Sequence, residues 1–446
     1  MTADAPAQQR VRGIGGAVAF SPLTLWIAFV LVHLWLGLLN LYGPGQPLGD
    51  VTGVYKFWMD RATQDAFWVG IDSQWVYPIV ALVPMVMALA AGPALYASTW
   101  LSMIMLLDAV AFGVLTGWGR SRLHLAAAWW WVAFLALLGP IALGRIDSVT
   151  VPLAIIGVLL IARRPRLAAL LLTVATWIKV WPAAIIAAVV IATKQRLRVL
   201  STVLITSLAV VAVALLLGSG SNVFSFVSQQ NGRGLQIESP VSTIWLWMTA
   251  AGVPGTSVYY DRAILTFQVD GPGALVAAQL MNPLFGLVVL VVCAIAILAV
   301  RRGATATELL APLSMALVTA FIVFNKVGSP QYETWLAVPV ILGLVTFERG
   351  GRSFRFAAVV TLVIAAITQA IYPTFYDYLL VVNPIMLIAI TSRNLLLIVL
   401  FGWAVTRVVR LARWATIHET FDDEAWEEPR HWPLGRADVE SKESQA

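Results

Sequence analysis

The chain has 446 residues, of which 60% are hydrophobic and 12% charged, and its mean hydropathy is +0.83. This composition excludes a soluble protein, because a soluble domain of this length cannot bury so much apolar surface, and it indicates a polytopic membrane protein. The net charge of +6 does not indicate nucleic-acid binding, since the basic residues lie in short loops between apolar stretches, as residues that orient membrane helices do. With one cysteine, Cys293, a disulfide framework and a cysteine-based metal site are also excluded.

Clusters of arginine and lysine separate the apolar stretches along the chain. The clusters are Arg10/Arg12, Arg120/Arg122, Arg163/Arg164/Arg166, Lys194/Arg196/Arg198, Arg301/Arg302, Arg349/Arg352/Arg355 and Arg407/Arg410/Arg413. If all of them are cytoplasmic, each interval between neighbours holds an even number of crossings. Two crossings in each interval predict an all-α integral membrane protein of about 12 transmembrane helices. The expected spans are 22–42, 95–117, 124–143, 148–162, 167–178, 181–193, 199–217, 275–300, 307–324, 335–347, 356–372 and 395–413.

Two stretches constrain this topology. The apolar run 77–92 must stay in the outer leaflet without crossing, because one more crossing would place a basic cluster outside. The run 167–193 is short for two spans, and we interpret it as a pair of helices broken at Lys179–Pro182, where the proline ends the first helix.

The same scheme divides the chain into three parts. Residues 1–21 form a cytoplasmic N-terminus before a retained first helix, and residues 22–413 form the membrane domain. The main extracytoplasmic segments of that domain are 43–94 and 218–274. The acid-rich, polar segment 414–446 is typical of a disordered tail, and we expect it in the cytoplasm.

The first outer loop is rich in carboxylates. Asp50 ends a Gly/Pro-rich stretch, so we expect it in a turn at the membrane surface, where a carboxylate can act as a general base for an acceptor hydroxyl. The alternative is an N-cap of a helix that starts near Thr52. Asp60, Asp65 and Asp72 instead have the pattern of the solvated face of an interfacial helix, with Phe57, Trp58, Phe67 and Trp68 on its other side. Tyr77 is a candidate substrate contact, although aromatics at this level more often anchor a helix at the membrane interface.

Charged residues in the short outer turns are candidates for binding. Arg145 and Asp147 lie in one turn between two predicted spans, and a local Arg145–Asp147 pair is the simplest expectation. Lys179 has no partner nearby in the sequence, which makes it the stronger candidate for an anionic ligand such as a phosphate.

Two longer polar segments add further candidates. In 228–239, Arg233 lies between two glycines, where a phosphate or sugar can approach it, and Gln236 and Glu238 suit hydroxyl groups; an irregular surface loop is the alternative. The segment 325–335 lies between two strongly apolar helices, and packing does not explain its polar residues Lys326, Gln331, Tyr332 and Glu333. We find no spacing typical of a metal site and no ATP-binding motif, so we expect no cofactor, and the energy must come from a gradient or an activated substrate.

Taken in order, these segments resemble the polyprenyl-phosphate-sugar-dependent glycosyltransferases of the GT-C superfamily. They are most similar to glycosyltransferase family 87, which includes actinobacterial mannosyltransferases and arabinofuranosyltransferases of the cell envelope. The matching segments are Gly49-Asp50 with Tyr55, Trp75-Val-Tyr-Pro78, the turn from Gly144 to Asp147, Ile178-Lys-Val-Trp-Pro182, Arg233-Gly-Leu-Gln-Ile-Glu-Ser239 and Lys326-Val-Gly-Ser-Pro-Gln-Tyr332.

The resemblance implies a GT-C-type fold and an inverting enzyme in the plasma membrane with its active site outside. It implies Asp50 as the base and Lys179, Arg233 and Lys326 around the phosphate of the donor. Other substrate contacts would come from Tyr55, Tyr77, Arg145, Asp147, Gln236, Glu238, Gln331 and Tyr332. The implied donor is a polyprenyl-phosphate sugar, mannose before arabinofuranose, and the acceptor is a glycolipid or lipoglycan.

Two other functions remain open on the sequence. A secondary transporter of about 12 helices would need acidic groups near the middle of the bilayer, where Asp108 is the one clear carboxylate within a predicted span. A non-enzymatic, lipid-binding membrane component is the third possibility.

Overall fold

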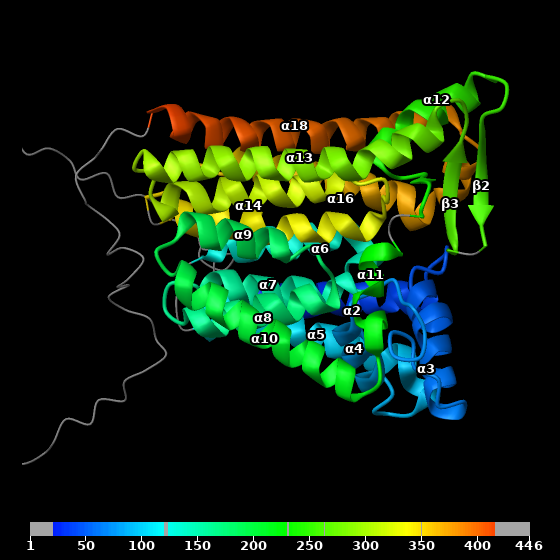
Figure 1. The fold of residues 1–446 in the computed structure, drawn as a ribbon, viewed down its shortest axis with the longest axis horizontal. Coiled ribbons are helices and arrows are strands. Elements are labelled where there is room, and N and C mark those ends of the chain that lie inside the picture. The colour runs from blue at the N-terminus through cyan, green and yellow to red at the C-terminus, as the bar shows by residue number, and fades with distance from the viewer. Residues whose placement is uncertain (1–20, 120–123, 230–231, 263, 349, 415–446) are drawn as a thin grey trace, which may run out of the picture.

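The computed structural model describes residues 21–414 apart from 120–123, 230–231, 263 and 349, and these residues are mostly helical (Figure 1). The predicted N-terminal segment up to residue 20 and the predicted tail after residue 414 lie outside this range. Among the described helices, eight are long and apolar enough to cross a membrane. They are α2 (Pro22–Tyr42), α5 (Tyr96–Thr116), α6 (Leu125–Leu138), α10 (Arg196–Leu216), α13 (Ala274–Arg301), α14 (Ala306–Val323), α16 (Arg355–Gln369) and α18 (Pro384–Trp414), some of them extended by adjoining 3-10 or π turns. The polytopic, helical fold is thus confirmed, while the count of twelve crossings is not.

Shorter helices account for the other expected crossings. They are α7 (Asp147–Leu160), α8 (Pro165–Ile178), α9 (Ala183–Ala192) and α15 (Ala337–Phe347). Ten residues of α-helix extend only about 15 Å, roughly half the thickness of the hydrocarbon core. The predicted break between α8 and α9 is present, because Lys179 is extended and Pro182 precedes α9.

Exposure separates the inner helices from the outer ones. Within the candidate spans, 78% of α14 is buried, compared with 11% of α10 and 17% of α13. α14 packs against α9, α13, α15 and α18. Its start is fixed by a capping box, in which Thr305 accepts a hydrogen bond from the amide of Glu308 and the Glu308 side chain reaches back to Thr305. α14 is therefore a central helix, and α10 and α13 are peripheral.

The connecting segments gather at one end of the bundle (Figure 1). This end carries the short helices α3 (Lys56–Gln64), α4 (Leu82–Met87), α11 (Ser225–Ser228), α12 (Thr243–Ala250) and α17 (Tyr376–Leu380). It also carries a small antiparallel sheet of order β1–β3–β2, made of β1 (Leu235–Gln236), β2 (Ser257–Asp261) and β3 (Thr266–Asp270). The apolar run 77–92 contributes only a 3-10 turn and the six residues of α4, too few to cross a membrane.

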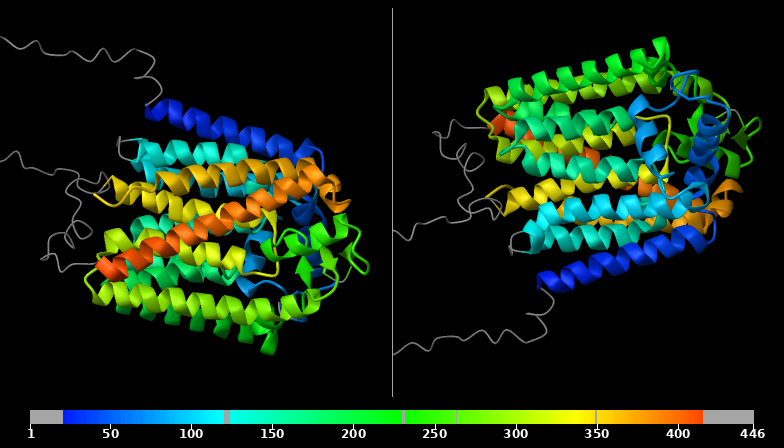
Figure 2. Two further views of the ribbon diagram at one scale, coloured as in Figure 1. Left: turned by 90° about the horizontal axis from the view of Figure 1, so that it is seen from above. Right: turned by 90° about the horizontal axis from the view of Figure 1, so that it is seen from below.

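The opposite end holds the start of α2 and the end of α18 (Figure 2). Three of the basic clusters meet at the end of α18, since Arg302 donates to the carbonyl of Ala412 (2.7 Å) and Arg407 donates to the carbonyl of Ser353 (3.3 Å). The cluster that includes Arg120 lies outside the described residues. These three basic clusters therefore lie at the same end of the bundle, as expected if they share one side of the membrane. The assignment of that side to the cytoplasm stays a prediction.

One predicted boundary is wrong. The last span was expected at 395–413, with 373–394 outside, but α18 already begins at Pro384. The polar pair Arg393 and Asn394 lies in the part of this helix that was expected outside the membrane. In the structure both side chains are buried and hydrogen-bonded to Glu238 and Thr243, so the helix continues through them.

The arrangement predicts which positions face the same solution. In a Cys293→Ser background, single cysteines at Asp65 or Ser257 should react with a membrane-impermeant maleimide added to intact cells, whereas cysteines at Arg164 or Arg302 should react only after permeabilisation. All four parent side chains are exposed, so burial does not explain a difference. Labelling of both groups from outside would contradict the topology.

Candidate active site

The predicted base and the predicted turn of charges meet at the end of the bundle that carries the sheet. Asp50 begins a π-helical turn, Asp50–Tyr55, that continues into α3. Its carboxylate lies 3.1 Å from the guanidinium of Arg145, and the two side chains are 39% and 7% exposed. Asp50 is therefore in neither the predicted non-helical turn nor the alternative N-cap position, which Gly49 occupies.

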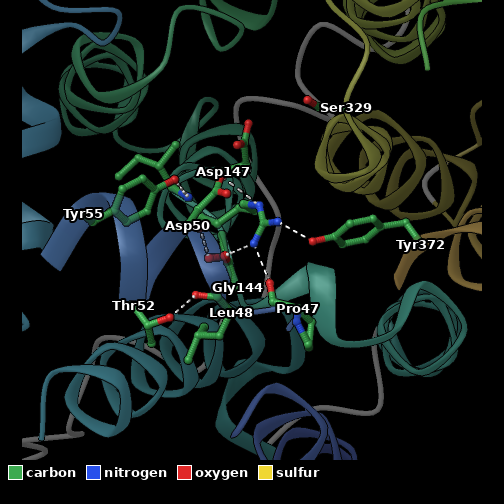
Figure 3. A network of polar contacts seen from close by, with 12 residues as sticks. Pro47, Leu48, Asp50, Thr52, Tyr55, Gly144, Asp147, Ser329 and Tyr372 are labelled. Carbon is green, nitrogen blue, oxygen red and sulfur yellow. Dashed lines mark hydrogen bonds and ion pairs between the residues drawn. The ribbon is translucent and has the colours of Figure 1, made fainter. Parts of the chain in front are cut away.

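Several groups hold Arg145 in place. Its guanidinium donates to the carbonyls of Pro47 and Gly144 and to the hydroxyl of Tyr372, the last at 2.7 Å. Figure 3 shows Asp50, Pro47 and Tyr372 around these contacts. Burial lowers the pKa of Arg145, but Asp50 and Tyr372 outweigh this effect and raise it, so the guanidinium stays charged.

Asp147 pairs with Lys179 instead of with Arg145. The Lys179 ammonium lies 3.4 Å from one carboxylate oxygen of Asp147, and the indole of Trp335 donates to the other at 2.7 Å. The local Arg145–Asp147 pair was therefore the wrong expectation. Asp147 is completely buried at the start of α7, facing Trp335, while Arg145 precedes the helix and reaches Asp50.

Aromatic rings surround Lys179. Its ammonium lies 5.0 Å from the ring centre of Tyr77 and 5.3 Å from that of Tyr332, and Tyr332 stacks on Trp335 at 4.2 Å. Burial lowers the pKa of Lys179, but the charge of Asp147 outweighs it and raises the pKa. The structure thus keeps a permanent cation against an aromatic wall.

Arg233 and Lys326 lie beside this group. Lys326 is 2% exposed, and burial together with the charge of Arg233 lowers its pKa. Lys179 and Arg233 are both close enough to Tyr332 to lower its pKa against the larger, raising effect of burial. Among the described residues, no acceptor lies within hydrogen-bond distance of the buried Nε of Arg233. The three predicted phosphate-binding cations therefore lie in one region.

The remaining predicted residues are part of the same end of the bundle. Gln236 connects the segment 228–239 to the segment 325–335 by two hydrogen bonds. Its backbone amide donates to the carbonyl of Lys326 (3.0 Å), and its side-chain amide donates to the hydroxyl of Ser329 (3.3 Å). The Tyr55 hydroxyl accepts from the amide of Ile146 (3.3 Å), so this tyrosine supports the turn of Arg145. Gln331 is buried in the 3-10 segment Pro330–Leu336.

Sequence reasoning missed Arg393, on α18. This arginine is 2% exposed and lies between Glu238 and Glu333, 3.6 Å and 4.0 Å from their nearest carboxylate oxygens. Burial raises the pKa of each glutamate to about 7, against the opposing charge of Arg393. One signal was available, because a single arginine within the apolar run 384–400 needs a buried partner.

Three other carboxylates of the segment 43–94 form local contacts. Asp60 pairs with Lys56 (2.6 Å), Asp65 with Arg61 (3.4 Å), and Asp72 accepts from the amide of Trp68 (2.7 Å). The predicted apolar face is wrong, since α3 buries Met59 and Ala62, Phe57 is 56% exposed, and Phe67 and Trp68 lie beyond the helix.

Asp108 also has a local role in packing. Its carboxylate lies 3.1 Å from Nε2 of His33, whose Nδ1 faces the carbonyl of Phe29 at 2.9 Å. Both side chains are buried between α2 and α5. The one clear carboxylate within a predicted span is thus paired within the packing of α2 and α5.

Comparison with protein families gives one match. A model of glycosyltransferase family 87 covers residues 75–324, more than half of the chain. Comparisons with curated proteins and with solved structures find no match. The matched range includes Tyr77, Lys179 and Arg233 but neither Asp50 nor Lys326.

The buried pair predicts unequal effects of two similar substitutions. Asp147→Asn leaves the Lys179 ammonium buried without its counter-charge, which should cost roughly 3–5 kcal/mol of stability. Asp60→Asn, which breaks the half-exposed Lys56–Asp60 pair, should cost at most about 1 kcal/mol. Thermal unfolding in one detergent measures both, and Asp147→Asn/Lys179→Met should recover part of the loss. Equal melting temperatures for the two single variants would contradict the pairing.

Proposed function

The chain belongs to glycosyltransferase family 87, and we propose that it transfers a sugar from a polyprenyl-phosphate donor to a hydroxyl group of a glycolipid or lipoglycan. The family establishes a glycosyltransferase, and the donor and acceptor classes are the proposal. Mannose is the favoured sugar, followed by arabinofuranose. We place the reaction at the outer face of the plasma membrane, on the end of the bundle that carries the sheet.

One observation carries the proposal, namely an accessible carboxylate next to a group of buried cations. Asp50 has a 39% exposed side chain, whereas the side chains of Asp147, Glu238 and Glu333 are buried. A base must reach the hydroxyl that it deprotonates, so accessibility favours Asp50. The fixed guanidinium of Arg145 would hold the Asp50 carboxylate in one orientation.

The cations suit the departing phosphate. In an inverting transfer, the acceptor oxygen bonds to the anomeric carbon while the bond from that carbon to the phosphate oxygen breaks. The hydroxyl proton passes to Asp50, and the bonding electrons leave with the polyprenyl phosphate. Negative charge grows on that oxygen, and positioned cations stabilise it. Lys179, Arg233 and Lys326 would supply the charge, and Arg233 Nε has a free hydrogen-bond direction among the described residues.

Other residues of the site suit a sugar. The rings of Tyr77, Tyr332 and Trp335 form an apolar wall beside Lys179, of the kind that packs against the carbon face of a sugar ring. Gln236, Glu238 and Gln331 offer groups that pair with hydroxyls. In this proposal, Asp147 keeps Lys179 in place, and Tyr55 supports the turn of Arg145.

The proposal predicts a selective loss of turnover in Asp50→Asn. The amide keeps the size of the side chain and can still accept from Arg145, but it cannot take a proton, so kcat should fall roughly 10²-fold or more with the donor KM little changed. Asp60→Asn on α3 is the matched control and should transfer sugar normally. The assay uses purified protein, a polyprenyl-phosphate mannose and a lipid acceptor. Near-normal kcat in Asp50→Asn would remove this residue as the base.

Removal of the cations should give a different kinetic pattern. Arg233→Gln or Lys326→Met should raise the donor KM and lower kcat together, because the phosphate is charged both before and after transfer. Lys56→Met, which removes a cation of the same end that pairs with Asp60, is the control. Lipid-phosphate binding without turnover, measured by native mass spectrometry, tests the same point. Unchanged donor binding in both variants would contradict the assignment.

A further inference from the structure

Arg393 connects two loops that are far apart in the sequence. It donates to the backbone carbonyl of Glu238 and to the side chain of Asn394 (2.8 Å), and its Nη1 lies near carboxylate oxygens of Glu238 and Glu333. Asn394 in turn donates to Thr243 (2.8 Å). The side chains of Arg393, Glu238 and Glu333 are at most 3% exposed. We call these three residues the triad.

The two loops of the triad carry cations of the proposed donor site. Arg233 precedes Glu238 by five residues, and Lys326 precedes Glu333 by seven. The loops are also packed closely, because a Cβ on Gly328 would collide with the backbone of Ser239. Movement of one triad glutamate would therefore displace the loop of Arg233 or that of Lys326.

The charge of the triad is unbalanced. Two carboxylates share one guanidinium, and one oxygen of each glutamate, Oε2, has no hydrogen-bond partner among the described residues. Burial raises the pKa of both glutamates to about 7. With one proton on the two carboxylates the triad is neutral, and loss of that proton leaves a net negative charge in a poorly solvated place.

Neighbouring groups do not cancel this charge. Glu238 is hydrogen-bonded to Tyr376 on α17. It also interacts electrostatically with Arg145 and with Tyr372. Arg145 is already paired with Asp50. Glu333 interacts with Arg393 and with Glu238.

We propose that Arg393 is a positioning residue that fixes the loops of Arg233 and Lys326 through Glu238 and Glu333, and that protonation of these carboxylates favours binding of an anionic donor. This role rests on the proposed function, which takes the donor to be a lipid phosphate bound at Arg233 and Lys326. The ionised triad adds negative charge between the two loops that carry the donor cations, so the donor KM should rise with pH.

The sign of the stability effect follows from the same groups. An ordinary glutamate has a pKa of 4.5, so between this value and about 7 the folded protein holds protons that the unfolded chain has lost. Stability should therefore fall as the pH rises through about 7 and then level off. This measurement needs no substrate.

The test compares Glu333→Gln and Arg393→Lys with control substitutions of the same residue types at the other end of the bundle. Glu308→Gln on α14 and Arg407→Lys on α18 are the controls, since both lie at the end remote from the sheet. Melting temperature without substrate and the donor KM and kcat are measured from about pH 5.5 to 8.5. Glu333→Gln should flatten both the fall in melting temperature and the rise in KM. Arg393→Lys should raise the donor KM roughly 5-fold or more, and any fall in kcat should accompany this rise, as in the Arg233 and Lys326 variants.

Three results would overturn the proposal. They are a parent melting temperature that does not fall through neutral pH, a Glu333→Gln profile equal to that of Glu308→Gln, and an Arg393→Lys variant that loses kcat with unchanged KM. Failure of the proposed function is recognised separately. If the parent protein transfers no sugar from any polyprenyl-phosphate donor, that function is wrong, and the melting profiles of parent and Glu333→Gln still decide whether the carboxylates titrate as proposed.

Discussion

Charged side chains that are buried at the end of a helical bundle must be paired, and this constraint organises the whole site. An isolated charge at such a position costs several kcal/mol, so each buried charge fixes the segment that carries its partner. The Arg145–Asp50 and Lys179–Asp147 pairs join the turn before α7 to the first outer loop and to the break after α8. Arg393 does the same for the two later loops. The site is thus assembled by ion pairs on a frame of apolar helices.

Much of the frame was predictable because it depends on local patterns. Mean hydropathy predicted a helical membrane protein, and the basic clusters predicted which connections share an end. The lengths of the individual helices were harder to predict. Hydropathy does not show that α9 has only ten residues, or that α18 continues N-terminally through Arg393, because burial of a polar side chain depends on partners from other segments.

Residue types predicted the location of the candidate site better than its contacts. Asp50, Lys179, Arg233 and Lys326 were selected because charges and loops lie between apolar helices, and the structure brings them to one end of the bundle. The partners could not be predicted, since Asp50 pairs with a residue 95 positions away and the neighbouring Arg145 and Asp147 look like each other's partner. Proximity in sequence favours the local pair, but the start of α7 turns the two side chains toward different segments.

Asp50 and Asp147 lie in different environments, which suits the separate roles proposed for them. Asp147 has no exposed surface and accepts from Trp335 while it faces Lys179, so its charge is used to hold a cation in place. A proton delivered there would break a buried ion pair and would leave Lys179 without a counter-charge. Asp50 is partly solvated, and its partner Arg145 also donates hydrogen bonds to Pro47, Gly144 and Tyr372. Solvent reaches Asp50 but not Asp147, and this difference, more than position in the sequence, supports the proposal that Asp50 is the base.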